Sequence, residues 1–159
     1  MIINKFKFTK ELVKEHVLYY WMKYVIGIGG IAVILFAYYL YLFLVSERQP
    51  ELIVFVCVLL IPVVLCVRIN KDIKNILERN RVQYGDEAPV YTVEMDEEIV
   101  VTVNEISMHI SPDNIKKYVQ TKNLLVLYIN GSMAVVLKKD SFVQGSVEEC
   151  IKWVKKYKK

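Results

Sequence analysis

The sequence predicts an α+β protein in which an N-terminal transmembrane helical hairpin is followed by a small antiparallel β-domain, closed by a C-terminal amphipathic helix. Three observations predict this class. Two long apolar runs occupy the first half of the chain, segments that alternate apolar and polar residues fill the second half, and a helical pattern ends it. The chain has 159 residues, of which 55% are hydrophobic and 24% charged, so the two classes are segregated along it.

The first apolar run, residues 24–45, contains no charged residue. At about 1.5 Å per residue, a helix of this length crosses a hydrocarbon core of roughly 30 Å. The second run, residues 51–69, spans a membrane if Glu51 and the stem of Arg68 lie at the interfaces. A buried core helix is the alternative for both runs, but no other segment is large enough to surround two such helices in water.

The distribution of cations predicts the orientation of this hairpin. Between the two runs only Arg48 is basic, whereas many basic residues precede the first run and follow the second. The positive-inside rule therefore places both termini in the cytoplasm and makes the protein multi-pass. The cations that flank the runs are Lys5, Lys7, Lys10, Lys14, Lys23, Arg68, Lys71, Lys74, Arg79 and Arg81.

A change of pattern at Gly85 and Pro89 marks the second domain, so we expect a membrane domain over residues 1–84 and a β-domain over residues 85–159. Residues 90–111 alternate with period two, as half-buried antiparallel strands do. Asn130-Gly131 lies between two β-rich runs and predicts a hairpin with a type I′ turn. Residues 2–8 also fit a strand, which would join the β-domain.

The last segment has the pattern of an amphipathic helix that closes the domain. Ser146 and Glu149 have the spacing of a capping box, and apolar residues recur at helical spacing after them.

This order of elements, together with the segment SPDNIKKYVQTKNLLVLYINGSMAVVLKKDSF, resembles the YcxB-like proteins of bacteria. Their cytoplasmic part resembles a pleckstrin-homology (PH) fold, so the resemblance implies a PH-like β-domain beneath the bacterial inner membrane. One departure is Ser111-Pro112-Asp113, where many relatives carry a tryptophan before the turn. The resemblance implies a fold and no particular activity, because the family has no well-defined common one.

The residues that could carry chemistry favour structural roles, and we expect no enzymatic activity, no cofactor and no metal. The GIGGIA segment fits a dinucleotide fingerprint by letter, but it lies inside a membrane run and not between a strand and a helix. Gly27 and Gly30 fit close helix packing instead, and Pro62 a bend in the second span. The three cysteines and two histidines have no metal-ligand spacing.

The remaining candidate is a basic surface near the C-terminus, made of Lys152, Trp153, Lys155, Lys156, Lys158 and Lys159. It could contact anionic lipid or a partner; the alternative is a solvated helix face. We expect an adaptor or regulator whose β-domain binds a protein partner or the inner leaflet. The second hypothesis is a self-protection (immunity) protein that neutralises a membrane-active toxin or bacteriocin. A net charge of +4 disfavours nucleic acid, and a homo-oligomer is compatible with the sequence.

Overall fold

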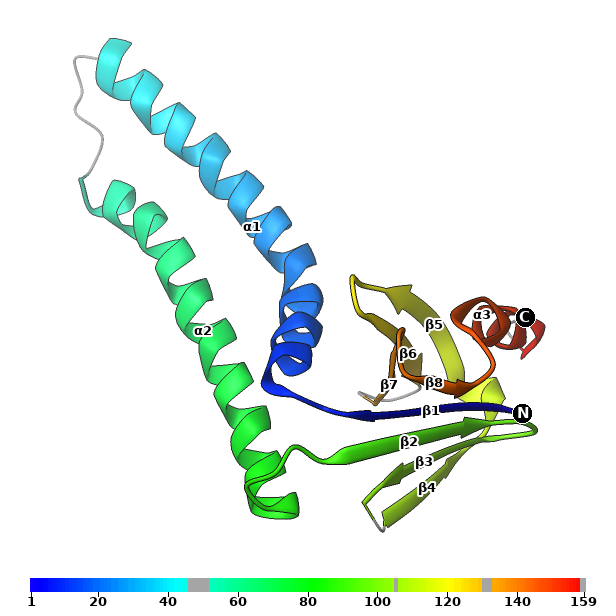
Figure 1. Ribbon diagram of the computed structural model, residues 1–159. Coiled ribbons are helices and arrows are strands. Elements are labelled where there is room, and N and C mark those ends of the chain that lie inside the picture. The colour runs from blue at the N-terminus through cyan, green and yellow to red at the C-terminus, as the bar shows by residue number, and fades with distance from the viewer. Residues whose placement is uncertain (46–51, 105, 130–132, 158–159) are drawn as a thin grey trace. The chain divides into compact units, whose positions relative to one another are not determined.

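A computed structural model describes residues 1–45, 52–104, 106–129 and 133–157 and confirms the α+β class, with long helices and antiparallel sheets (Figure 1). In chain order the elements are β1 Ile2–Lys7, α1 Lys10–Val45, α2 Leu52–Tyr84, β2 Val90–Met95, β3 Ile99–Val103, β4 Ile106–Ile110, the 3-10 turn η1 Pro112–Asn114, β5 Ile115–Gln120, β6 Leu124–Ile129, β7 Ala134–Lys138, β8 Phe142–Gln144 and α3 Val147–Tyr157.

The chain divides into two compact units. The first, which we call the β-domain, combines Met1–His16 with Leu77–Lys159, and the second, the helical unit, is Val17–Ile76. The helical unit is therefore inserted into the sequence of the β-domain. Both long helices begin or end within the β-domain and continue into the helical unit.

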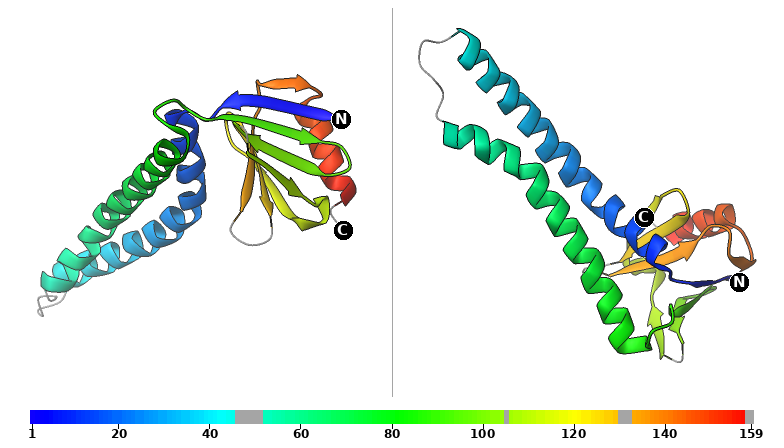
Figure 2. Two further views of the ribbon diagram at one scale, coloured as in Figure 1. Left: turned by 90° about the horizontal axis from the view of Figure 1, so that it is seen from below. Right: turned by 60° about the vertical axis from the view of Figure 1, so that its left-hand side comes forward.

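The β-domain contains two antiparallel sheets. The strand order is β4-β3-β2-β1-β8 in the five-stranded sheet and β5-β6-β7 in the three-stranded sheet (Figure 2). The N-terminal residues that fitted a strand form β1, which lies between β2 and β8. Since a strand at this position pairs on both sides, β1 connects the two flanking strands into one sheet.

The pairing of β1 with β2 shows where the helical unit is inserted. Lys7 pairs with Val90 in the antiparallel register, and the amide of Phe8 donates to the carbonyl of Pro89 over 3.0 Å. These two strands would be joined by a short turn in an ordinary hairpin. Here both long helices take the place of that turn.

The main core lies between the two sheets and α3. Alternate residues of the strands face it because side chains on a strand point to opposite faces in turn. The buried members of this core are Ile2, Val93, Met95, Ile99, Ile110, Ile115, Leu125, Leu127, Ile129, Val135, Leu137, Cys150 and Val154. On the other face of β6, Leu124 and Val126 are buried too. The three-stranded sheet therefore has apolar cover on both faces of its central strand.

The helical unit exposes most of its apolar side chains. In the most apolar window of α1 no residue is buried, and its length and composition would allow it to cross a membrane. Among the residues that the structure describes, it is the one helix that meets this criterion. A polar contact links the two helices, where the indole Nε1 of Trp21 donates to Asp72 over 3.0 Å. The expected hairpin tip, residues 46–50, lies outside the described residues.

Candidate functional site

The C-terminal helix carries part of the predicted basic surface. The hydroxyl of Ser146 accepts from the amide of Glu149 over 3.2 Å, which caps the first turn of α3, as the capping-box spacing predicts. Cys150 and Val154 face the core, so Lys152, Lys155 and Lys156 are left exposed on the other side. Lys158 and Lys159 lie outside the described residues.

Trp153 differs from the lysines around it because its side chain belongs to the domain. The ring packs against the main core, and Nε1 donates to the carbonyl of Asp96 over 2.8 Å. Its ring centroid also lies 4.8 Å from that of Tyr157. These contacts tie α3 to the turn between β2 and β3. The sequence analysis grouped Trp153 with the surface lysines, because the helical pattern alone does not show that the turn between β2 and β3 lies close to α3.

The turn between β2 and β3 is strongly acidic and borders an open depression of about 440 Å³. Its lining residues are Met1, Glu94, Asp96, Glu97, Glu98 and Val100. On the neighbouring strand β4, Nδ1 of His109 lies 2.7 Å from a carboxylate oxygen of Glu98. No group of histidine, cysteine and acidic side chains in the described part of the chain is arranged to hold a metal ion. Four carboxylates, those of Glu94, Asp96, Glu97 and Glu98, therefore line this depression.

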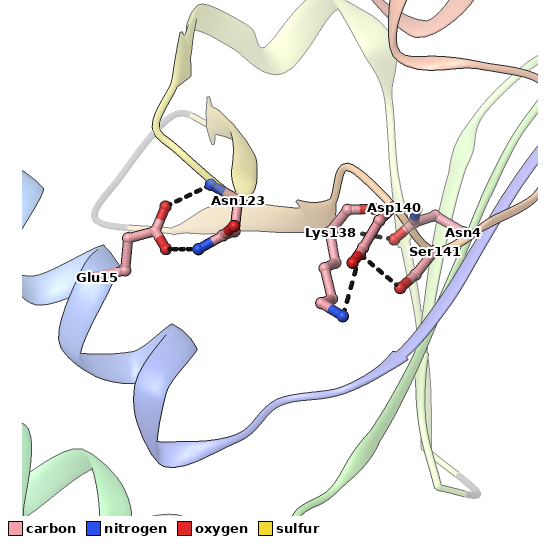
Figure 3. Close-up of polar contacts among 6 residues, drawn as sticks. All are labelled: Asn4, Glu15, Asn123, Lys138, Asp140 and Ser141. Carbon is pink, nitrogen blue, oxygen red and sulfur yellow. Dashed lines mark hydrogen bonds and ion pairs between the residues drawn. The ribbon is translucent and has the colours of Figure 1, made fainter.

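Asn4 is the one polar side chain that is fully buried among the described residues. Its amide Nδ2 donates to the carbonyl of Lys138 over 2.8 Å, and its Oδ1 accepts from the amide of Lys138 over 3.1 Å (Figure 3). A side-chain amide thus makes to β7 the two hydrogen bonds that a neighbouring strand would make. This residue joins β1, and with it the five-stranded sheet, to the edge of the three-stranded sheet.

Glu15, in the first turns of α1, binds the turn between β5 and β6. Its carboxylate accepts from the backbone amide and the side-chain amide of Asn123, each over 2.7 Å, and from the hydroxyl of Thr121 (Figure 3). Burial raises the pKa of this carboxyl, but the hydrogen bonds outweigh that effect and hold the pKa below its ordinary value. The start of α1 is therefore fastened to the three-stranded sheet. Nothing in the helical pattern distinguished Glu15 from other exposed acidic residues.

His16 follows in the same turn and is largely enclosed. Its Nδ1 is buried without a hydrogen-bond partner, and burial lowers the pKa of the imidazole. Because a neutral ring is favoured in such a place, His16 serves the packing of the domain.

The predicted packing residues of the helices stand apart from other elements. Within the described residues, a Cβ added at Gly27 or Gly30 would have no neighbouring atom within 4 Å. Pro62 is exposed and lies inside α2, which is helical from Leu52 to Tyr84. These positions therefore leave room for another surface to approach the helices.

The outer edge of the five-stranded sheet presents an apolar surface. On β4 the side chains of Ile106 and Met108 are 60% and 48% exposed, whereas Ile110 on the same face is buried. The alternation of apolar and polar residues predicted a strand at 106–110. It did not predict that the apolar face of this strand is exposed, because that depends on which other elements cover the face. Topology, and not the local pattern, makes β4 an edge strand.

Comparison with known proteins identifies one family. The search of curated proteins and the search of solved structures each found no match. The family model described as YcxB-like protein matches residues 95–154, a range that runs from the end of β2 into α3 and includes β4 and the three-stranded sheet. The match confirms the resemblance predicted from the sequence, since residues 95–154 of this chain are similar to a YcxB-like domain.

Proposed function

We propose that this chain is a non-catalytic integral protein of the bacterial inner membrane whose cytoplasmic β-domain binds a protein partner. In this proposal α1 and α2 form a transmembrane hairpin with both termini in the cytoplasm, and the β-domain has a PH-like fold. The inner leaflet is a second surface that the β-domain can meet through the lysines of α3.

The observation that carries the proposal is the exposed apolar surface of α1. Soluble monomers rarely expose a contiguous apolar patch of more than a few hundred Å². Along α1, large apolar side chains are exposed on all sides, which suits a lipid environment and is costly in water at about 25 cal/mol for each Å². The exposed residues are Val25, Ile26, Ile31, Val33, Ile34, Leu35, Phe36, Leu40, Phe43, Leu44 and Val45.

The architecture of the β-domain supports binding over catalysis. Two antiparallel sheets and a C-terminal helix enclose a core of apolar side chains, an arrangement that suits a PH-like fold. Several of its ionisable side chains form local pairs, such as Lys138 with Asp140 at 3.0 Å. Two of its exposed apolar residues, Ile106 and Met108, lie side by side on one face of β4, so a protein partner suits this surface better than a small polar substrate.

Fractionation of cells that express the full chain tests the anchoring. We expect the protein in the membrane pellet after washing with alkaline carbonate, and recovery in the supernatant would overturn the proposal. A cysteine at Lys159 tests the orientation. In intact cells it should resist a membrane-impermeant maleimide until the inner membrane is opened.

In-cell crosslinking followed by mass spectrometry tests the binding. Two double variants are compared. One carries Ile106→Lys and Met108→Lys on β4, and the other carries Lys152→Glu and Lys155→Glu on α3. Loss of a crosslinked protein only with the β4 pair assigns binding to β4. Loss only with the α3 pair moves the contact to the basic surface.

A further inference from the structure

The four edges of the two sheets differ in how they are protected against pairing with another chain. Natural edge strands are blocked by lysines, bulges, short length or a covering group. β5 has Lys116, Lys117 and a shift of register between Ile115 and Lys117, and β8 has only three residues. β7 is bridged to β1 by the amide of Asn4. Three edges therefore carry a recognised block.

β4 carries none of these blocks. All five of its residues pair with β3 in an unbroken register from Val103–Ile106 to Ile99–Ile110. Its sequence, ISMHI, contains no lysine, no proline and no acidic residue. Within the described residues β3 is its one partner in the sheet, so the outer edge of β4 offers unpaired backbone groups beside exposed apolar side chains.

We propose that β4 pairs antiparallel with β4 of a second copy of this chain, which extends the five-stranded sheet across a two-fold axis at Met108. This register uses all five residues. It places Ile106 opposite Ile110 of the other copy, and Met108 opposite its own counterpart. Apolar residues then meet apolar residues at each position of that face, since opposed residues of antiparallel strands share a face.

The charges of the strand agree with a second copy at β4. On the polar face the same register brings Ser107 opposite His109, so no two like charges are opposed. His109 already lies against Glu98 of its own chain at 2.7 Å, which balances any charge on the ring.

The size of the contact indicates where pairing takes place. A stable interface between soluble proteins buries about 800 Å² on each partner, and one five-residue strand offers much less. Confinement to one membrane raises the local concentration of the two copies, as a short tether does. The pairing thus rests on the membrane anchoring of the proposed function and names a second copy as the protein partner.

Disulfide trapping in membranes tests the register with the full chain. The background carries Cys57→Ala and Cys66→Ala, and Cys150 stays because it is buried. Met108→Cys should give an oxidised dimer at about five times the yield of Ser107→Cys or His109→Cys, because only residue 108 faces its own counterpart. Equal yields at the three positions, or no dimer with Met108→Cys, would overturn the proposal. So would a heavier species formed with another protein.

Charge exchange separates pairing from misfolding. Met108→Lys and Met108→Glu should each reduce dimer capture about tenfold when expressed alone, and co-expression of the two should restore it. Val143→Lys is the matched control, because Val143 is 69% exposed on another edge strand and should leave the dimer unchanged. Failure of co-expression to restore the dimer contradicts the pairing. Fractionation of the same samples measures separately whether each variant is still in the membrane pellet, so a failure of anchoring is distinguished from a failure of pairing.

Discussion

Replacing Asn4 by alanine tests how the two sheets of the β-domain are held together. The substitution removes the donor to the carbonyl of Lys138 and the acceptor from its amide, which lie 2.8 and 3.1 Å from the side chain. A buried backbone group left without a partner costs about 1–3 kcal/mol. Two such groups would cost about 2–6 kcal/mol. Because Lys138 is only half-buried, water can partly replace the lost hydrogen bonds, so the cost falls in the lower half of this range. We expect a loss of about 2–4 kcal/mol in the free energy of unfolding.

Urea unfolding of the full chain in mild detergent measures this loss. The chain has two tryptophans, so a Trp21→Phe background leaves Trp153, which packs on the core of the β-domain, as the reporter. Lys5→Ala is the control, since Lys5 lies on the same strand and is exposed. A change below about 0.5 kcal/mol for Asn4→Ala, equal to that of a neutral surface substitution, would show that the Asn4 side chain does not hold the two sheets together.

Three further predictions concern other contacts of the β-domain. The lowered pKa of Glu15 means that its hydrogen bonds stabilise the fold above the ordinary carboxyl pKa and that this stability is lost as pH falls through the folded value. Glu15→Gln should therefore flatten the acid limb of a plot of unfolding free energy against pH, and an unchanged slope would contradict this. Gly145 has φ of +83°, and an added Cβ would lie 3.2 Å from Ile2, so Gly145→Ala should cost about 1–2 kcal/mol in the same urea assay; no loss would argue against this conformation. Burial raises the pKa of Cys150 to about 12, so its thiol should react with maleimide at pH 8 only as the domain unfolds, and rapid labelling of the folded chain would contradict its burial.

Local patterns were sufficient to predict the existence of the three helices and the cap of α3, whereas α1 and α2 extend beyond the predicted runs. Helix α1, Lys10–Val45, contains the first predicted run, residues 24–45, and α2 ends just before Gly85, where the sequence pattern changes and φ is +87°. The strands β6 and β7 flank the Asn130-Gly131 turn, although the turn itself lies outside the described residues. Each of these features depends on residues close together in the sequence.

The features that depend on distant pairing were harder to predict. In β1, Ile2, Asn4 and Phe6 share one face, so a polar residue in an apolar phase was the one signal that Asn4 has a buried partner. Its partner, Lys138, is 134 residues away. Likewise, β4 has the alternation of a half-buried strand, and only its place at the sheet edge leaves Ile106 and Met108 exposed. Local periodicity carries no information on which strands become neighbours.

The insertion of the helices between β1 and β2 also bears on how the domain can be isolated. A chain that starts at Val90 lacks β1 and leaves β2 and β8 without their shared neighbour. It also lacks Glu15 and the first turns of α1. We expect such a chain to aggregate, whereas one that keeps Met1–His16 retains every strand of both sheets.

The anchoring role of the helical unit is tested by replacing residues 17–76 with a flexible linker of about eight glycines and serines, which spans roughly 16 Å on average. We expect this shortened chain to move from the membrane pellet to the supernatant. Its amide spectrum should show the dispersion of a folded β-protein, because all eight strands and Glu15 are kept. A chain that stays in the pellet as folded protein would contradict the anchoring role of the helical unit. A soluble but unfolded chain would contradict the claim that the β-domain is complete without it.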